Sequence, residues 1–233
     1  MEAISMKQMQ RLRLKAVRRK AVRARNEPPR LSLGEEVFNA VSHGLGAVLA
    51  GIGFVLLLVK ARGGMEVAAA CVYGASMVLM MLMSCIYHAM KTGSAAKRVL
   101  RRFDYLSIYL LIGGTFAPVL LLYVGGRLGL AIFAVQWAVI LAGAALVAAF
   151  GPGRWRALHF TLYFLIGWSG LFFLPSLYRD APVLLAFIFA GGAVYTLGMI
   201  PFARSRKFDH CAWHLCVLLA AALHWAGIYT QLF

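Results

Sequence analysis

Residues 128–150, LGLAIFAVQWAVILAGAALVAAF, decide the fold, because 23 consecutive residues pass there without one charged side chain. A membrane-spanning helix needs about 20 predominantly apolar residues to cross roughly 30 Å of hydrocarbon. Six further apolar runs of similar length lie before and after this stretch, and each is bounded by charges, Gly or Pro. The seven predicted spans are 37–59, 67–88, 104–123, 128–150, 158–177, 183–201 and 211–233.

The composition of the whole chain agrees with these spans. Of its 233 residues, 62% are hydrophobic and the mean hydropathy is +0.77, which is more apolar surface than a soluble domain of this size hides in one core. The connections are short, so consecutive helices must be antiparallel and form one bundle. The sequence therefore predicts an all-α, polytopic membrane protein, with a basic cytoplasmic amino-terminal arm at 1–34 and a seven-helix transmembrane domain at 35–233.

The positive charges indicate how the bundle lies in the membrane. With the amino terminus inside, 20 of the 24 Lys and Arg residues fall on the inner side and 4 on the outer side. Basic residues favour the cytoplasmic side of short loops, so we expect the amino terminus inside and the carboxy terminus outside, in a multi-pass protein of the plasma (cell) membrane. An Arg-rich, acid-poor start is also typical of an organelle transit peptide, and this alternative stays open.

The formal charge of +16 also bears on the partners of the protein. Such a charge is compatible with nucleic acid, but loops held against anionic lipid explain it more simply in a membrane protein. We therefore expect membrane lipids, and no nucleic acid, as partners, with a lipid substrate or ligand as a further possibility.

Ionisable residues inside the predicted spans point to a functional site, because each of them is expensive to hold in lipid. His88 ends the second span, with Ser84 one turn earlier on the same helix face. Asp104 opens the third span. His210 and His214 open the seventh span at the i, i+4 spacing that lets two imidazoles on one helix bind one metal. The predicted topology places all of these residues at the inner side of the membrane.

Three imidazoles and a carboxylate at one depth match the ligands that zinc prefers. A lone histidine near a helix end is more often a hydrogen-bonding or lipid-interface residue, but the set favours a metal. We therefore expect a Zn²⁺ site at His88, His210 and His214, with Asp104 as a fourth ligand or as the base. The pair HCAWH lacks the glutamate of HExxH metalloproteases, so Asp104 is the natural substitute.

Two other histidines are predicted to lie outside the metal site. His224 lies ten residues beyond His214, about 15 Å deeper at the rise of an α-helix, and we expect it to form an interhelical hydrogen bond. His159 stands near the inner end of the fifth span, where we expect it to face the aqueous side.

A polar stripe opens the first span. Glu36, Asn39 and His43 are spaced i, i+3 and i+7 and face the same inner level. One interpretation is that they orient the metal ligands or relay protons. The other is a helix cap with interhelical hydrogen bonds, and the sequence leaves both open.

Four motifs, in their order and spacing, resemble those of a known family. They are EEVFNAVSHGLGA (35–47), SCIYH (84–88), RRFDYLSIYLLIGGTFAP (101–118) and HCAWHLCVLLAAALH (210–224). Together they resemble the hemolysin III proteins of the progestin and adipoQ receptor family, over about 35 to the end of the chain. That family is similar to the alkaline ceramidases, and the resemblance implies seven helices, an inside amino terminus and a zinc held by three histidines near the cytoplasmic face.

Carried over residue by residue, the resemblance implies His88, His210 and His214 as the zinc ligands. It implies Asp104 as the residue that holds and deprotonates the zinc-bound water. It further implies Ser84 as a contact to the substrate or to this water.

Three functions are compatible with these inferences. The first is an intramembrane zinc hydrolase of a lipid amide or ester, in which zinc activates water and polarises the scissile carbonyl while Asp104 takes the proton. The second is a non-enzymatic, receptor-like sensor of membrane state with a structural zinc, which a closed four-ligand site would favour. The third is the pore that the family name implies, but a channel needs a polar stripe through the bilayer, and apart from His224 the deep levels are almost wholly apolar.

Overall fold

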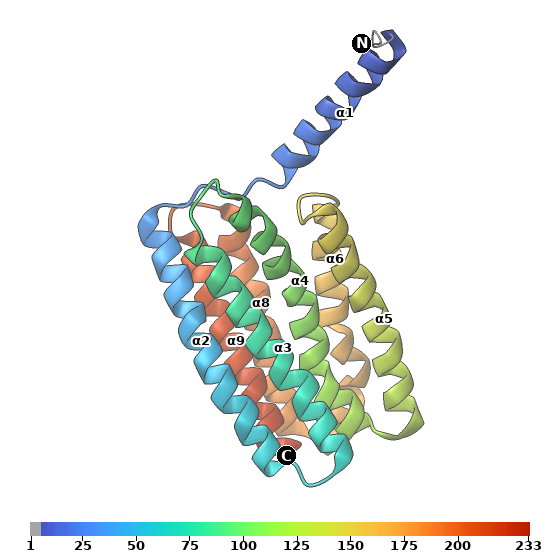
Figure 1. The fold of residues 1–233 in the computed structure, drawn as a ribbon. Helices are drawn as coiled ribbons and strands as arrows, with labels where there is room; N and C mark the ends of the chain where they lie inside the picture. Colours follow the sequence, from blue (N-terminus) through green and yellow to red (C-terminus); the bar gives the residue numbers. More distant parts are fainter. Residues whose placement is uncertain (1–5) are drawn as a thin grey trace.

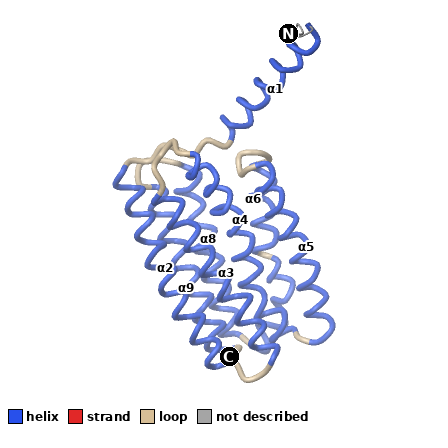
Figure 2. Tube along the Cα trace, viewed as in Figure 1, coloured by secondary structure: helices blue, strands red, loops and turns tan. Residues whose placement is uncertain are grey.

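The computed structural model describes residues 6–233, and every regular element in this range is a helix (Figures 1 and 2). The α-helices are α1 (Met6–Arg25), α2 (Leu33–Lys60), α3 (Gly64–Ala89), α4 (Ala95–Pro118), α5 (Gly126–Phe150), α6 (Arg156–Gly167), α7 (Leu174–Asp180), α8 (Pro182–Arg204) and α9 (Asp209–Gln231). A π-helix, η1 (Val119–Val124), extends α4, and a 3-10 helix, η2 (Ser169–Phe173), joins α6 to α7.

These helices confirm the seven predicted spans. Seven stretches within 6–233 are long and apolar enough to cross a membrane: Leu33–Lys60, Gly64–Ala89, Ala95–Val124, Gly126–Phe150, Arg156–Asp180, Pro182–Arg204 and Asp209–Gln231. Two of them are irregular. The third continues past Pro118 as a π-helix, consistent with the amide hydrogen that proline lacks, and the fifth is interrupted by η2.

The outer surface of the bundle is apolar. On α2, Val41, Leu45, Val48 and Ile52 are spaced three or four residues apart and are each more than half exposed. Such a row lies on one helix face, which a water-soluble bundle would bury. The exposed row therefore agrees with lipid as the main solvent.

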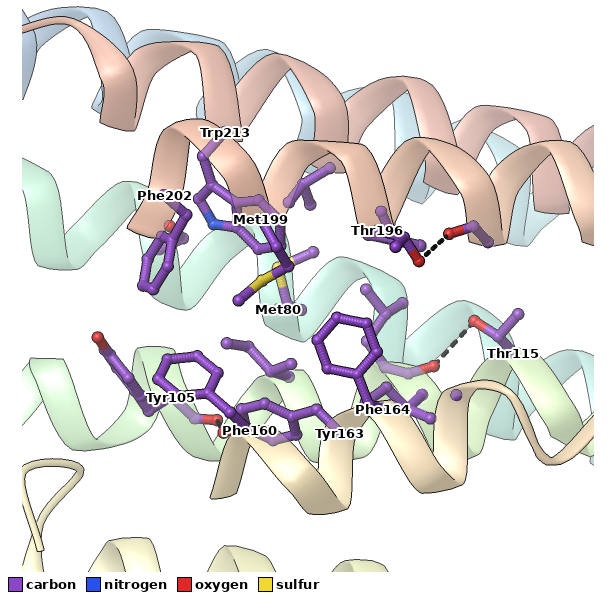
Figure 3. Close-up of a pocket in the computed structure, with 18 of the residues that line it drawn as sticks. Met80, Tyr105, Thr115, Phe160, Tyr163, Phe164, Thr196, Met199, Phe202 and Trp213 are labelled. Atoms are coloured by element: carbon purple, nitrogen blue, oxygen red, sulfur yellow. Dashed lines mark hydrogen bonds between the residues drawn. The ribbon is translucent and has the colours of Figure 1, made fainter. Parts of the chain in front are cut away.

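Two apolar clusters hold the helices together, and α4 contributes to both. The larger cluster joins α2, α3, α4 and α9 and includes Ala70, Met77 and Val217. The smaller cluster joins α4, α5 and α6 around Tyr109 and Ile140. Helix α8 packs on α9, and α6 packs on α4. These two pairs face each other across the interior (Figure 3).

Close approach of α3 and α4 depends on Gly114. A Cβ atom at this position would collide with the Ser76 side chain and lie 3.1 Å from the carbonyl oxygen of Val72. Gly114→Leu is therefore expected to lower the free energy of unfolding by about 1–3 kcal/mol or more, because overpacking forces the helices apart. The thermal unfolding midpoint in detergent measures this loss.

The control for Gly114→Leu is Gly51→Leu. Gly51 also lies inside a helix, but a Cβ there would meet nothing within 4 Å. We expect its unfolding midpoint to match or slightly exceed that of the parent, because leucine favours helix more than glycine does. Equal losses in both variants would contradict the close α3–α4 approach.

The basic arm forms the helix α1, which projects from one end of the bundle, opposite to the carboxy terminus (Figure 1). Its base is fixed by Asn26, which donates from Nδ2 to the Phe150 carbonyl oxygen at 3.1 Å and accepts from the Gly153 amide at 3.1 Å. We call this end of the bundle the arm end. That the arm end faces the cytoplasm stays a prediction from the charges.

Candidate metal centre

Three histidines at helix ends meet at the arm end of the bundle. His88 lies in the last turn of α3, and His210 and His214 lie in the first two turns of α9. One ligand nitrogen of each lies within 4.8 Å of the other two, and Nε2 of His88 is 3.3 Å from Nε2 of His210. The structure therefore brings together the three residues predicted as ligands, here called the histidine trio.

Contacts at the start of α9 fix the position of its two histidines along the axis of the bundle. Asp209, the first residue of α9, accepts a hydrogen bond from the Arg206 amide at 2.7 Å and forms an ion pair with Arg204 at 2.6 Å. The Phe208 amide donates to Oε1 of Glu35 on α2 at 2.8 Å. An acidic residue at the beginning of a helix also stabilises the helix. The first turn of α9 is therefore held by Asp209 within its own segment and by Glu35 of α2.

The distance between the His88 and His210 nitrogens fits a tetrahedral metal ion. Zinc binds imidazole nitrogens at about 2.0–2.1 Å, which places two such nitrogens about 3.4 Å apart on a tetrahedral ion. The 3.3 Å between the His88 and His210 nitrogens matches this separation. Nδ1 of His214 is buried and finds no hydrogen-bond partner within residues 6–233, and imidazole is a ligand that suits zinc.

Glu36 of α2 contacts the far side of the His88 ring. Its Oε2 lies 2.8 Å from Nδ1 of His88, and both residues are buried. A carboxylate at Nδ1 makes this nitrogen the donor and leaves Nε2 with the lone pair that a metal needs. Glu36 is therefore placed where the orienting interpretation of the polar stripe requires it.

The two remaining members of the stripe lie next to His214. The His43 ring stacks on the His214 ring with centroids 3.8 Å apart and an angle of 27° between the planes. The ring nitrogens of His43 and the side-chain amide of Asn39 are buried and have no hydrogen-bond partner in the described part of the chain. Ordered water commonly satisfies such groups, so this corner of the centre suits bound water.

Asp104 and Ser84 border the trio. The Asp104 carboxyl group interacts with the Ser84 hydroxyl group and with the His88 ring. Within residues 6–233, the candidate ligand atoms that lie within 4.8 Å of one another belong to the three histidines, and Asp104 is not among them. Asp104 and Ser84 thus lie at the rim of the trio, on the side of α4 and α3.

A largely apolar cavity of about 170 Å³ leads from the trio into the bundle (Figure 3). It lies between the α8–α9 pair and the α4–α6 pair and extends to His224, while Ser84 and Asp104 line it near the trio. Its labelled aromatic residues are Tyr105, Phe160, Tyr163, Phe164, Phe202 and Trp213. The hydroxyl groups of Thr115 and Thr196 donate to carbonyl oxygens of their own helices at 2.9 and 2.8 Å, so these positions add little polarity.

The two histidines predicted to lie outside the site have different outcomes. Nε2 of His224 lies 3.1 Å from the Ile188 carbonyl oxygen on α8, which confirms an interhelical hydrogen bond. The prediction for His159 is wrong, because this residue is only 2% exposed and its Nδ1 lies 2.9 Å from the Tyr109 hydroxyl group. The packing of α6 against α4 buries it.

Sequence reasoning missed Lys97. By charge alone it is one of the 20 basic residues predicted on the inner side, yet its side chain is fully buried and its Nζ lies 2.9 Å from Oε1 of Glu36. The available signal was its spacing: Lys97 precedes Asp104 by seven residues, two turns along the same face of α4. It belongs to the surroundings of the trio.

Comparison with known proteins gives a consistent match. The family described as "Haemolysin-III related" matches residues 31–225. The chain is 32% identical to "Hemolysin-3" of Bacillus cereus over 194 residues, which cover 81% of this chain and 88% of that protein. It is 30% identical to "Hemolysin-3 homolog" of Bacillus subtilis (strain 168) over 196 residues, which cover 82% and 91%.

A more distant similarity extends to animals. The chain is 25% identical to the human "Monocyte to macrophage differentiation factor" over 207 residues, which cover 85% of each protein. The matched stretch of 31–225 contains every residue of the histidine trio, together with Glu36, Ser84 and Asp104.

Proposed function

Since the chain belongs to the haemolysin-III related family, we propose that it is an intramembrane zinc-dependent hydrolase of a lipid amide or ester. The proposed site is the histidine trio with Asp104 and Ser84 at its rim. From the distribution of basic residues, we place it near the cytoplasmic face of the cell membrane.

One observation carries this proposal: two histidines of the trio, His210 and His214, line the same apolar cavity as Asp104 and Ser84. A purely structural metal site is usually closed by four protein ligands, whereas a catalytic site keeps a position open beside its reacting groups. A base, a hydroxyl group and an apolar cavity next to three imidazoles suit hydrolysis of a lipid better than a structural role.

The residues of the chain divide the work as follows. Zinc, when bound, lowers the pKa of its water to about 7 and polarises a carbonyl group. The trio would hold the ion, and Glu36 would fix the His88 ring. We expect Asp104 to accept a proton from water at the trio and Ser84 to contact the substrate or that water.

The cavity suits the hydrocarbon chain of a lipid whose head group stays at the arm end. Its walls are aromatic and aliphatic, and they exclude water from the reacting groups. Ion conduction requires polar or charged lining, so the cavity favours a lipid chain over a pore.

The test is release of fatty acid from ceramides and glycerophospholipids by detergent-purified protein, followed by mass spectrometry. We expect the parent to hydrolyse one of these two lipid classes, and the Ser84→Ala and Asp104→Asn variants to lose this activity. A parent that binds zinc and yet releases no more fatty acid than these variants, from either amides or esters, would favour the sensor with a structural zinc.

Thr115→Phe is expected to shorten the preferred acyl chain. Thr115 lies in the last turn of α4 and lines the deep part of the cavity, so a phenyl ring there fills space that a long chain needs. We expect kcat/KM for long-chain substrates to fall about tenfold or more, with short-chain substrates unchanged, since each unaccommodated methylene group costs affinity.

The control for Thr115→Phe is Thr230→Phe. Thr230 is exposed on α9 and donates to the Ala226 carbonyl oxygen at 2.7 Å, outside the cavity. Its chain-length profile should equal that of the parent. An unchanged profile in Thr115→Phe would place the acyl chain elsewhere.

A further inference from the structure

Lys97 is buried at a position where a lysine is expensive. Its side chain is 0% exposed, although lysine is almost never fully buried unless its charge is paired. It lies in the first turn of α4, next to the connection from α3. A residue held there must have compensating contacts, and these contacts converge on the metal centre.

The first set of contacts is to the end of α3. Nζ of Lys97 donates to the carbonyl oxygens of Tyr87 at 3.1 Å, His88 at 3.4 Å and Met90 at 3.1 Å. The last carbonyl groups of a helix lack partners within the helix, and a cation there satisfies them. Lys97 therefore fixes the backbone that carries His88.

The second contact is to the side chain that orients His88. Oε1 of Glu36 lies 2.9 Å from Nζ of Lys97, while Oε2 of the same carboxylate lies 2.8 Å from Nδ1 of His88. Glu36 thus bridges an ammonium group and an imidazole ring. Lys97 holds His88 twice, through its backbone and through its ring.

We propose that Lys97 is a positioning residue of the metal centre: with Glu36 it fixes the orientation in which the His88 ring presents Nε2 to the trio. This inference rests on the proposed metal centre but not on hydrolysis. Without the ammonium group, Oε1 of the buried Glu36 carboxylate would keep only the Thr92 hydroxyl group at 3.5 Å, and the carboxylate could turn away from His88 toward water. Residues that orient metal ligands typically contribute 10–100-fold to metal affinity.

The experiment measures the zinc dissociation constant by chelator competition, and the absorption spectrum of bound Co²⁺, on the detergent-purified full chain. Lys97→Met is expected to bind zinc about 10–100-fold more weakly and to shift the Co²⁺ bands, because the His88 ring is no longer fixed. Lys97→Arg keeps the charge and the donors, so it is expected to restore most of the affinity and the parent spectrum.

Lys60 provides a matched control at the other end of the bundle. Its Nζ donates to the Tyr229 carbonyl oxygen at 2.8 Å and lies 4.3 Å from the centre of the Tyr229 ring, as Lys97 lies 4.8 Å from that of Tyr87. Lys60→Met loses a hydrogen bond to a helix end and a contact with a tyrosine ring without touching Glu36 or the trio. Its zinc affinity and Co²⁺ spectrum should equal those of the parent.

A double-mutant cycle with Glu36→Gln separates positioning from a loss of folding. Removing both partners of a buried ion pair is tolerated better than removing one, so the double variant Glu36→Gln/Lys97→Met should fold. If Lys97 acts through Glu36, the loss of zinc affinity in the double variant is clearly smaller than the sum of the two single losses.

Three results would overturn the inference. Additive losses in the cycle, or parent-like affinity and Co²⁺ spectrum in Lys97→Met, would show that Lys97 does not fix the His88 ring together with Glu36. A parent that binds no zinc would remove the metal centre and the positioning role together. A parent that binds zinc but hydrolyses nothing would refute the proposed hydrolase and leave the role of Lys97 standing.

Discussion

Replacing His210 and His214 together by alanine is expected to remove the metal from the protein. These residues supply two of the three nitrogens that lie within 4.8 Å of one another, and one imidazole alone does not hold zinc against the aqueous buffer. Metal analysis of detergent-purified protein, prepared without a polyhistidine tag, should give about one zinc per chain for the parent and none for the double variant.

His224→Ala is the control for this loss. His224 lies on the same helix and is partly buried, but its Nε2 bonds to the Ile188 carbonyl oxygen and it stands apart from the trio. Its variant should retain the parent zinc content. Little zinc in parent and variants alike would refute both the metal centre and the hydrolase.

Asp104→Asn is expected to abolish hydrolysis and to leave the zinc in place. A general base typically contributes 10²–10⁴-fold to the rate, and an amide cannot accept the proton. The side chain keeps its size, and Asp104 is not one of the mutually close candidate ligands. The measurements are kcat for the lipid substrate found in the screen and the zinc content of the same preparation.

Asp180→Asn is the matched substitution for Asp104→Asn. Asp180 lies in α7 and pairs with Arg179 at 2.9 Å on the exposed surface, so its variant should keep both zinc and activity. Loss of zinc from Asp104→Asn would instead identify Asp104 as a fourth ligand and favour a structural site. Full activity with zinc retained would assign the base elsewhere.

The spans and the trio were predictable because each depends on one simple constraint. Lipid demands about 20 apolar residues per crossing, so length alone located the helices. Because successive helices cross the membrane in opposite directions, each helix end could be assigned to one side. This assignment placed His88 at the level of His210 and His214 without knowledge of any contact. The structure places the three rings together.

The remaining features depend on contacts between distant parts of the chain. A count of basic residues treats each lysine as a surface charge, yet Lys97 is buried by a carboxylate 61 residues away on α2 and by the end of α3. His159 is buried by Tyr109 of another helix. The cavity could not be predicted for a related reason. In a sequence, apolar residues that line a cavity look the same as apolar residues that pack against one another.

The order of the helices along the chain also has a consequence for biogenesis. His88 precedes His210 by 122 residues, and chains emerge from the ribosome amino terminus first. Six of the seven spans are therefore synthesised before the α9 histidines exist. A metal held by the trio stabilises only the completed bundle, so metal retention would report whether the last helix has been inserted correctly.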